Sequence, residues 1–114
     1  MITLLCDNMK KDLYWINFLC LGGEVRGNFT KGGVNLYVLP KDPKKSEIDF
    51  NKNREGYYGW MGYGGSLVQW HPEMKIGFAF IPTLISGVEL CNERGAVLQQ
   101  IVKDCCLKPA NTTE

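Results

Sequence analysis

The sequence lacks most of the features that would assign a function directly. It holds a single histidine, His71, and its five cysteines form no C-x-x-C pair, which disfavours a zinc site or a thiol redox motif. No apolar run approaches the length of a membrane span. Thirteen basic and twelve acidic residues leave no electrostatic case for binding nucleic acid or an anionic membrane. We therefore expect no metal, no cofactor, no nucleic-acid partner and no membrane span.

The 114 residues suit one small domain, and 45% of them are hydrophobic, which is ordinary for a globular protein. Without motif spacing, the cysteines are interpreted as small buried apolar side chains. These are Cys6, Cys20, Cys91, Cys105 and Cys106.

The N-terminal segment, residues 1–33, is apolar at first and then broken by Gly22-Gly23. The stretch from Leu13 to Leu21 resembles the middle of a signal peptide, but Asp7 and Asp12 interrupt its basic flank. A buried helix or strand is the favoured interpretation. A weak helical spacing of Leu13, Ile16, Phe18 and Leu19 predicts a helix within this third of the chain, unless the segment is poorly ordered.

Residues 34–106 are predicted to form the main unit, followed by a tail at 107–114. Alternation from Val34 to Leu39 predicts a strand. The charged stretch from Pro40 to Gly56 carries two prolines and no evident apolar face, so it is predicted to be a long surface loop.

A hairpin is predicted next. Ser66 to Trp70 and Ile76 to Ile81 read as antiparallel strands, and the four residues from His71, with Pro72 second, supply the turn. Both faces of the second strand are apolar, which predicts an interior strand covered on both sides.

A C-terminal helix is predicted from about Val88 to Cys105. Gly95 lies within it and is expected to cross closely over Gly77 and Ala79. The expected buried face consists of Cys91, Leu98, Val102 and Cys105, with Val97 and Ile101 beside it. Asn92 is a candidate cap for a later helix start. The predicted fold class is α+β: a small antiparallel sheet of three to five strands with the C-terminal helix packed on one face.

The stretch "GYYGWMGYGGSLVQWHPEMKIGFAFIPT" resembles the C-terminal part of the serine beta-lactamase-related family, which includes class C beta-lactamases, penicillin-binding proteins and animal beta-lactamase-like proteins. The glycine-rich turn matches, "HPE" from His71 stands where "DPE" is common, and "NERGAVLQQIV" from Asn92 resembles the last helix. The likeness covers about residues 56–104. It implies a fragment of the beta-lactamase/transpeptidase-like fold.

The sequence departs from this family where its chemistry lies. The family's serine nucleophile stands in S-x-x-K, and no such motif or Y-x-N partner is present. Trp60, Met61 and Gly62 occupy the third motif, where an indole replaces the usual histidine or lysine. The resemblance places a backbone oxyanion region near Gly64, Gly65 and Ser66.

Two functional hypotheses follow. The first is a truncated beta-lactamase-related protein without catalytic residues of its own, whose intact relatives are serine hydrolases of ester or amide bonds and whose partner is the missing N-terminal half. The second is a small binding module that presents an aromatic face around Trp60 and Trp70 to a protein.

Other interpretations of the same residues are weaker. "GYGGS" precedes a strand, not the helix that a phosphate-binding loop needs. His71 has no nucleophile or orienting acid in a motif, so a surface or capping histidine is favoured. Tyr57, Tyr58 and Tyr63 join the tryptophans around the glycines, either as a ligand groove or, as we favour, as core.

Overall fold

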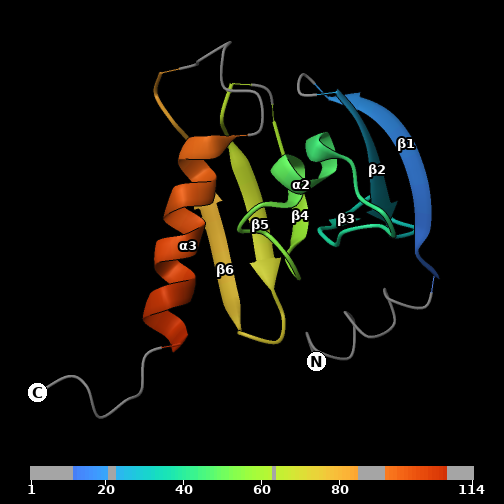
Figure 1. Ribbon diagram of the computed structural model, residues 1–114. Coiled ribbons are helices and arrows are strands. Elements are labelled where there is room, and N and C mark those ends of the chain that lie inside the picture. Colours follow the sequence, from blue (N-terminus) through green and yellow to red (C-terminus); the bar gives the residue numbers. More distant parts are fainter. Residues whose placement is uncertain (1–11, 21–22, 63, 85–91, 108–114) are drawn as a thin grey trace, which may run out of the picture.

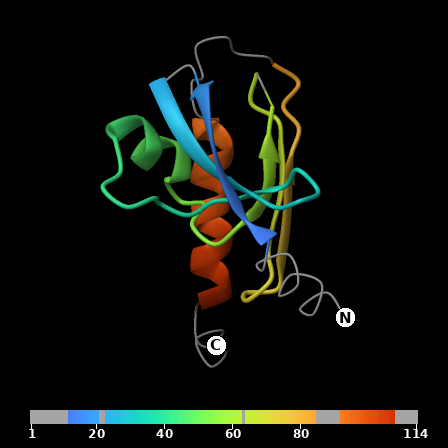
Figure 2. The ribbon, with the colours of Figure 1, turned by 90° about the vertical axis from the view of Figure 1, so that its right-hand side faces the viewer.

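The computed structural model describes residues 12–20, 23–62, 64–84 and 92–107, and it has an α+β fold. Six antiparallel strands form one sheet in the order β1-β2-β3-β4-β5-β6, and helices α2 and α3 lie on one face of it (Figures 1 and 2). The elements are β1 (Tyr14–Cys20), β2 (Gly23–Phe29), β3 (Asn35–Leu36), α2 (Lys45–Asn51), β4 (Tyr58–Met61), β5 (Leu67–His71), β6 (Ile76–Phe80) and α3 (Glu93–Leu107).

The first two strands correct the expectation of an N-terminal helix. β1 pairs with β2 along its whole length, with Phe18 opposite Val25. Val25 is buried, and Phe18 packs against the same core, whereas Trp15 and Leu19 are exposed. The segment therefore forms a strand, in which Phe18 faces the core and its neighbour Leu19 faces solvent. The helical spacing of its apolar residues was too weak a signal to predict its structure. The side chains between Tyr14 and Leu19 are also more exposed than predicted.

The charged stretch after β3 corrects the expectation of a long loop. It contains helix α2, whose Phe50 is buried in the core and contacts the ring of Tyr37 at 5.3 Å between centroids. Apart from Pro40, the other buried residues of this stretch are polar: Glu47, Asn51 and Arg54. A helix that buries one aromatic ring and two polar side chains has no apolar stripe, so the periodicity rule could not find it.

The hairpin of β5 and β6 is confirmed, with Gln69 opposite Phe78, although the strands shift to Leu67–His71 and Ile76–Phe80. The face formed by Ile76, Phe78 and Phe80 turns inward as predicted. The opposite face was expected to be covered, but Gly77 and Ala79 are exposed. β6 pairs only with β5 in the described part of the chain, so it is an edge strand.

Helix α3 packs on the sheet as predicted, but through a different face. Its buried residues are Gly95, Ala96 and Gln99, while Leu98 and Cys105 are exposed and Val102 is only partly buried. Gly95 does sit at a close approach, against Leu67 and not against Gly77 and Ala79. The small face meets the sheet because a side chain at position 95 would overlap Leu67. The predicted start near Val88, and Cys91, lie outside the described residues.

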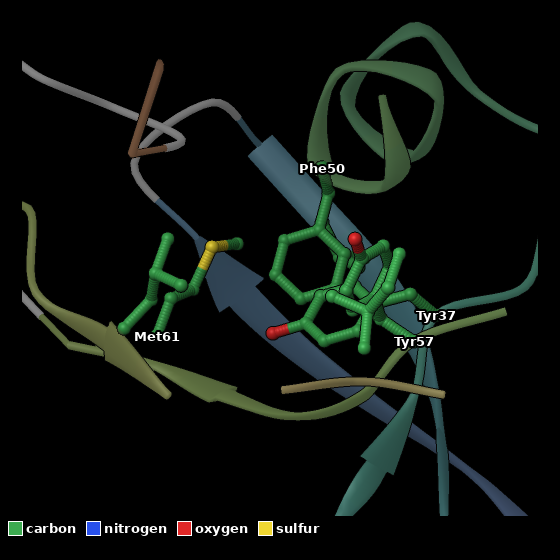
Figure 3. Packing of buried hydrophobic residues seen from close by; sticks show 7 residues of the cluster. Tyr37, Phe50, Tyr57 and Met61 are labelled. Carbon is green, nitrogen blue, oxygen red and sulfur yellow. The ribbon is translucent and has the colours of Figure 1, made fainter. Parts of the chain in front are cut away.

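The core lies between the sheet and the two helices (Figure 3). Helix α2 contributes Phe50, and the strands and their flanks contribute two buried tyrosines and four further apolar side chains around it. The cluster consists of Val25, Tyr37, Phe50, Tyr57, Met61, Leu67 and Ile76. β1 and β2 therefore share one core with the strands of the predicted main unit.

Candidate functional site

The residues that the sequence assigned to a degenerate site lie on one tight connection between β4 and β5. Gly62 donates its N–H to the carbonyl oxygen of Ser66 at 2.7 Å, and Gly65 donates to the carbonyl oxygen of Gly62 at 3.4 Å. Trp60 and Met61 end β4 immediately before this turn. Two of the turn's backbone donors are thus engaged within the turn, which matters because an oxyanion site requires donors directed at the ligand.

Two side chains at the start of α3 hold the same turn. The Asn92 side-chain amide donates to the carbonyl oxygens of Gly62 and Ser66, both at 3.0 Å. Arg94 donates to the carbonyl oxygen of Gly64, also at 3.0 Å. The sequence analysis proposed Asn92 as a helix cap, and α3 does begin directly after it. Its side chain, however, binds the turn between β4 and β5. Neither contact was foreseen, because both join residues about thirty positions apart.

The Trp60 side chain packs on aromatic rings next to the core and is also partly exposed to solvent. Its side chain is 43% exposed, and its ring lies 5.7 Å from Phe18 and 5.5 Å from Phe29. Trp70 belongs to a different ring pair, stacked on the buried Tyr58 at 6.2 Å and 14°. The two indoles therefore lie in separate ring clusters. Tyr63 lies outside the described residues.

His71 is buried, which corrects the surface alternative, and it caps the turn between β5 and β6. It is only 8% exposed, and its Nδ1 accepts a hydrogen bond from the backbone N–H of Met74 at 3.2 Å. The ring of Tyr57 meets it edge-on. Burial lowers the pKa of His71, and Lys103 lowers it further. A neutral imidazole whose Nδ1 already accepts a bond offers no free base at that atom.

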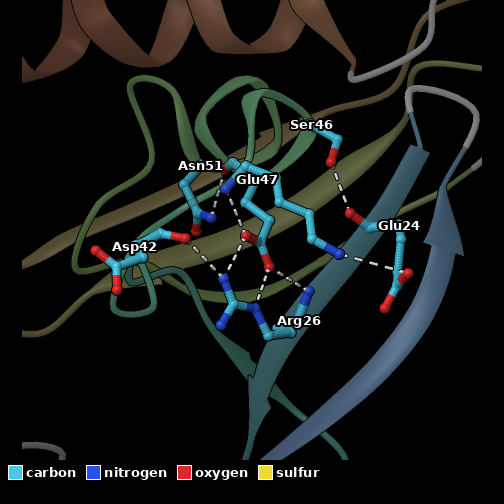
Figure 4. A network of polar contacts seen from close by, with 7 residues as sticks. Glu24, Arg26, Asp42, Ser46, Glu47 and Asn51 are labelled. Carbon is cyan, nitrogen blue, oxygen red and sulfur yellow. Dashed lines mark hydrogen bonds and ion pairs between the residues drawn. The ribbon is translucent and has the colours of Figure 1, made fainter.

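Among the described carboxylic acids, Glu47 has the most strongly perturbed pKa, and the sequence did not single it out. Its carboxylate receives three bonds from Arg26: from Nε at 2.7 Å, from Nη2 at 2.8 Å and from the backbone N–H at 2.9 Å. The backbone N–H of Lys44 adds a fourth at 2.8 Å. Figure 4 shows this cluster joining α2 to β2. These bonds, led by the side-chain bond from Arg26, lower the pKa of Glu47 to about 2.

The remaining chemistry-bearing groups do not assemble into a site. In residues 12–20, 23–62, 64–84 and 92–107, no group of three or more His, Cys, Asp or Glu side chains could hold a metal ion. Cys105 and Cys106 are exposed, which corrects the expectation that they are buried, and Cys20 is half-buried. Cys6 and Cys91 lie outside the described residues. Within the described part, no helix is long and apolar enough to cross a membrane.

Comparison with models of known protein families, with curated proteins and with solved structures found no match.

Proposed function

We propose that this chain is a beta-lactamase-related protein that acts without catalysis of its own. The observation that carries the proposal is the state of the third-motif segment. Trp60 packs on Phe18 and Phe29, and the N–H groups of Gly62 and Gly65 donate hydrogen bonds within the turn. The resemblance over residues 56–104 supports the family, and the missing S-x-x-K and Y-x-N motifs support the loss of activity.

The chemical argument concerns proton transfer. An acyl-serine mechanism needs a base that takes the serine proton and donors that stabilise the oxyanion. Indole only donates, so Trp60 cannot replace a histidine or lysine in that role. Ser66 is the serine of the turn, and its backbone carbonyl is occupied by Gly62 and Asn92.

Hydrolysis assays test this part of the proposal. The purified chain is incubated with a chromogenic beta-lactam and with a nitrophenyl ester, beside a Ser66→Ala variant and an active serine beta-lactamase. We expect the wild type and Ser66→Ala to match the buffer rate. Turnover by the wild type that disappears in Ser66→Ala or after a serine-directed reagent contradicts the proposal.

A second candidate function is partner binding, and the outer face of α3 favours it. Val97 and Ile101 stand one turn apart and are 58% and 53% exposed, with the exposed Leu98 beside them. Helix α3 itself lies next to β6, because Gly95 on its buried face approaches Phe80 (Figure 1). Contiguous exposed apolar residues mark interaction surfaces. The face around Trp60 and Trp70 is a poorer candidate, because its two indoles lie in separate ring clusters.

The partner in this second candidate is a protein, and the remaining part of a beta-lactamase-like domain is the form that the resemblance favours. Light scattering coupled to size exclusion measures self-association of the wild type and of Ile101→Lys. Ile48→Lys is the matched control, because Ile48 lies on α2 and is 47% exposed. We expect the wild type to be retained on a column bearing the candidate partner domain and Ile101→Lys to be retained less. Any self-associated wild-type species should become monomeric in Ile101→Lys, and Ile48→Lys should behave as the wild type. Monomeric wild type with no retention on a column bearing the candidate partner domain contradicts partner binding.

A further inference from the structure

Four buried polar side chains meet between the sheet and α3, and each keeps one polar atom without a partner. Asn35, Tyr37, Gln69 and Gln99 are each exposed by 1% or less. Among the described residues, Asn35 Nδ2, Tyr37 Oη, Gln69 Nε2 and Gln99 Oε1 have no hydrogen-bond partner of ordinary geometry. Buried polar atoms are nearly always paired with protein or ordered water, so four orphans in one place require an explanation.

The register of the sheet explains why these groups are neighbours. Asn35 stands opposite Gly59, and Gly59 stands opposite Gln69, so the three form one row across β3, β4 and β5. Gly59 contributes no side chain, so no side chain separates Asn35 from Gln69 in this row. Its φ of 133° and the nearby backbone of Val68 exclude a larger residue there.

Tyr37 and Gln99 complete the arrangement. Gln99 Nε2 donates to Gln69 Oε1 at 2.6 Å, which brings the end of the α3 side chain onto the row. Asn35 and Gln69 also approach the hydroxyl of Tyr37: burial raises the pKa of Tyr37, and Arg54 and these two amides oppose that rise. The four orphaned atoms thus surround one region at the sheet–helix interface.

We propose that this region is a binding site for one ordered internal water molecule. The hydrogen-bonding capacities match: a water accepts from Asn35 Nδ2 and Gln69 Nε2 and donates to Gln99 Oε1 and Tyr37 Oη. Internal waters characteristically make two to four bonds to buried polar groups that would otherwise be unpaired. The water would then bridge α3 and the sheet. Helix α3 would pack on the sheet through a polar, hydrated contact instead of an apolar stripe.

The direct test is a high-resolution crystal structure together with NMR detection of slowly exchanging water at the Gln69 and Gln99 side-chain amides. We expect density for one water within bonding distance of at least three of the four atoms, and water cross-peaks to both amides. The site is absent if the crystal structure shows the two glutamine amides turned over and all four side chains bonded directly to one another with no water between them.

Variants separate the water site from a general loss of packing. Gln99→Leu removes the acceptor and should abolish the water cross-peak at Gln69, with an unfolding constant raised roughly ten-fold or more. Gln100→Leu is the matched control, because this neighbouring glutamine bonds Asp104 on the surface of α3; its cross-peaks should match the wild type. If Gln99→Leu does not fold, Tyr37→Phe removes one partner with little change in shape. An unchanged cross-peak at Gln69 in the folded Gln99→Leu variant overturns the proposal, as does, in Tyr37→Phe, a water that exchanges as slowly as in the wild type.

Discussion

Replacing Glu47 with glutamine tests how one carboxylate fixes α2 to the sheet. Arg26 and Lys44 bond both of its oxygens, and these bonds lower its pKa from 4.5 to about 2. A pKa difference of about 2.5 corresponds to roughly 3 kcal/mol at 1.36 kcal/mol for each pKa unit. The Arg26 side chain is 30% exposed, so solvent screens part of this attraction. We expect Glu47→Gln to lower the free energy of unfolding by about 2 kcal/mol near pH 7.

The pH dependence gives this prediction a second, independent observable. Glu47 binds its proton less tightly in the folded protein than in the unfolded chain. Its contribution is therefore complete above a pH of about 4.5 and is lost as the pH falls through about 2. Glutamine does not titrate, so the loss of stability across this window should be smaller in Glu47→Gln than in the wild type.

Urea unfolding followed by tryptophan fluorescence measures both quantities. Asp49→Asn is the control on the same helix, because Asp49 pairs with Lys45 at an exposed position and should matter by less than about 0.5 kcal/mol. The reasoning fails if Glu47→Gln unfolds within about 0.5 kcal/mol of the wild type and keeps the wild-type pH profile.

Three further predictions use the same unfolding assay. Burial, then Lys103, lowers the pKa of His71; the unfolded chain binds its proton more tightly, so stability should fall as the pH drops below about 6.5, and His71→Gln should flatten this part of the profile. Gly59→Ala should cost about 3 kcal/mol or more, because φ is 133° and a Cβ would overlap the backbone of Val68; a neutral result contradicts the backbone assignment. Phe50→Ala should cost about 3 to 5 kcal/mol, and a cost below about 1 kcal/mol would mean that α2 is not part of the core.

The hairpin of β5 and β6 was predictable because its signals are local. Ile76, Phe78 and Phe80 alternate along one strand, and Pro72 stands at the turn. The expectation that both faces are covered was wrong for a non-local reason. Small apolar residues such as Gly77 show where a neighbour can fit, and the sequence does not show whether a neighbour is present.

The helices were harder to predict because polar side chains hold both of them. Helix α2 is fixed by Glu47 on Arg26, twenty-one residues away, and its only buried apolar residue is Phe50. Helix α3 buries Gln99 because its side chain donates a hydrogen bond to the Gln69 side chain on the sheet. A count of apolar residues therefore assigned α3 the wrong face, with Leu98 inward. Each error comes from a long-range polar partner that hydrophobic periodicity does not register.

The glycine-rich turn combines what the sequence could and could not indicate. Its residues were predicted to lie together, and they do, between Gly62 and Ser66. What the turn contacts depends on Asn92 and Arg94, which follow the last strand and begin α3. A turn that stabilises a transition state must keep donors directed at an empty position, whereas a turn that joins two elements uses its polar groups on them. Three carbonyls of this turn accept bonds from Asn92, just before α3, and Arg94 in its first turn, and two of the turn's N–H groups bond within it. The stretch that resembles an active-site motif therefore connects the turn between β4 and β5 to the start of the last helix through hydrogen bonds.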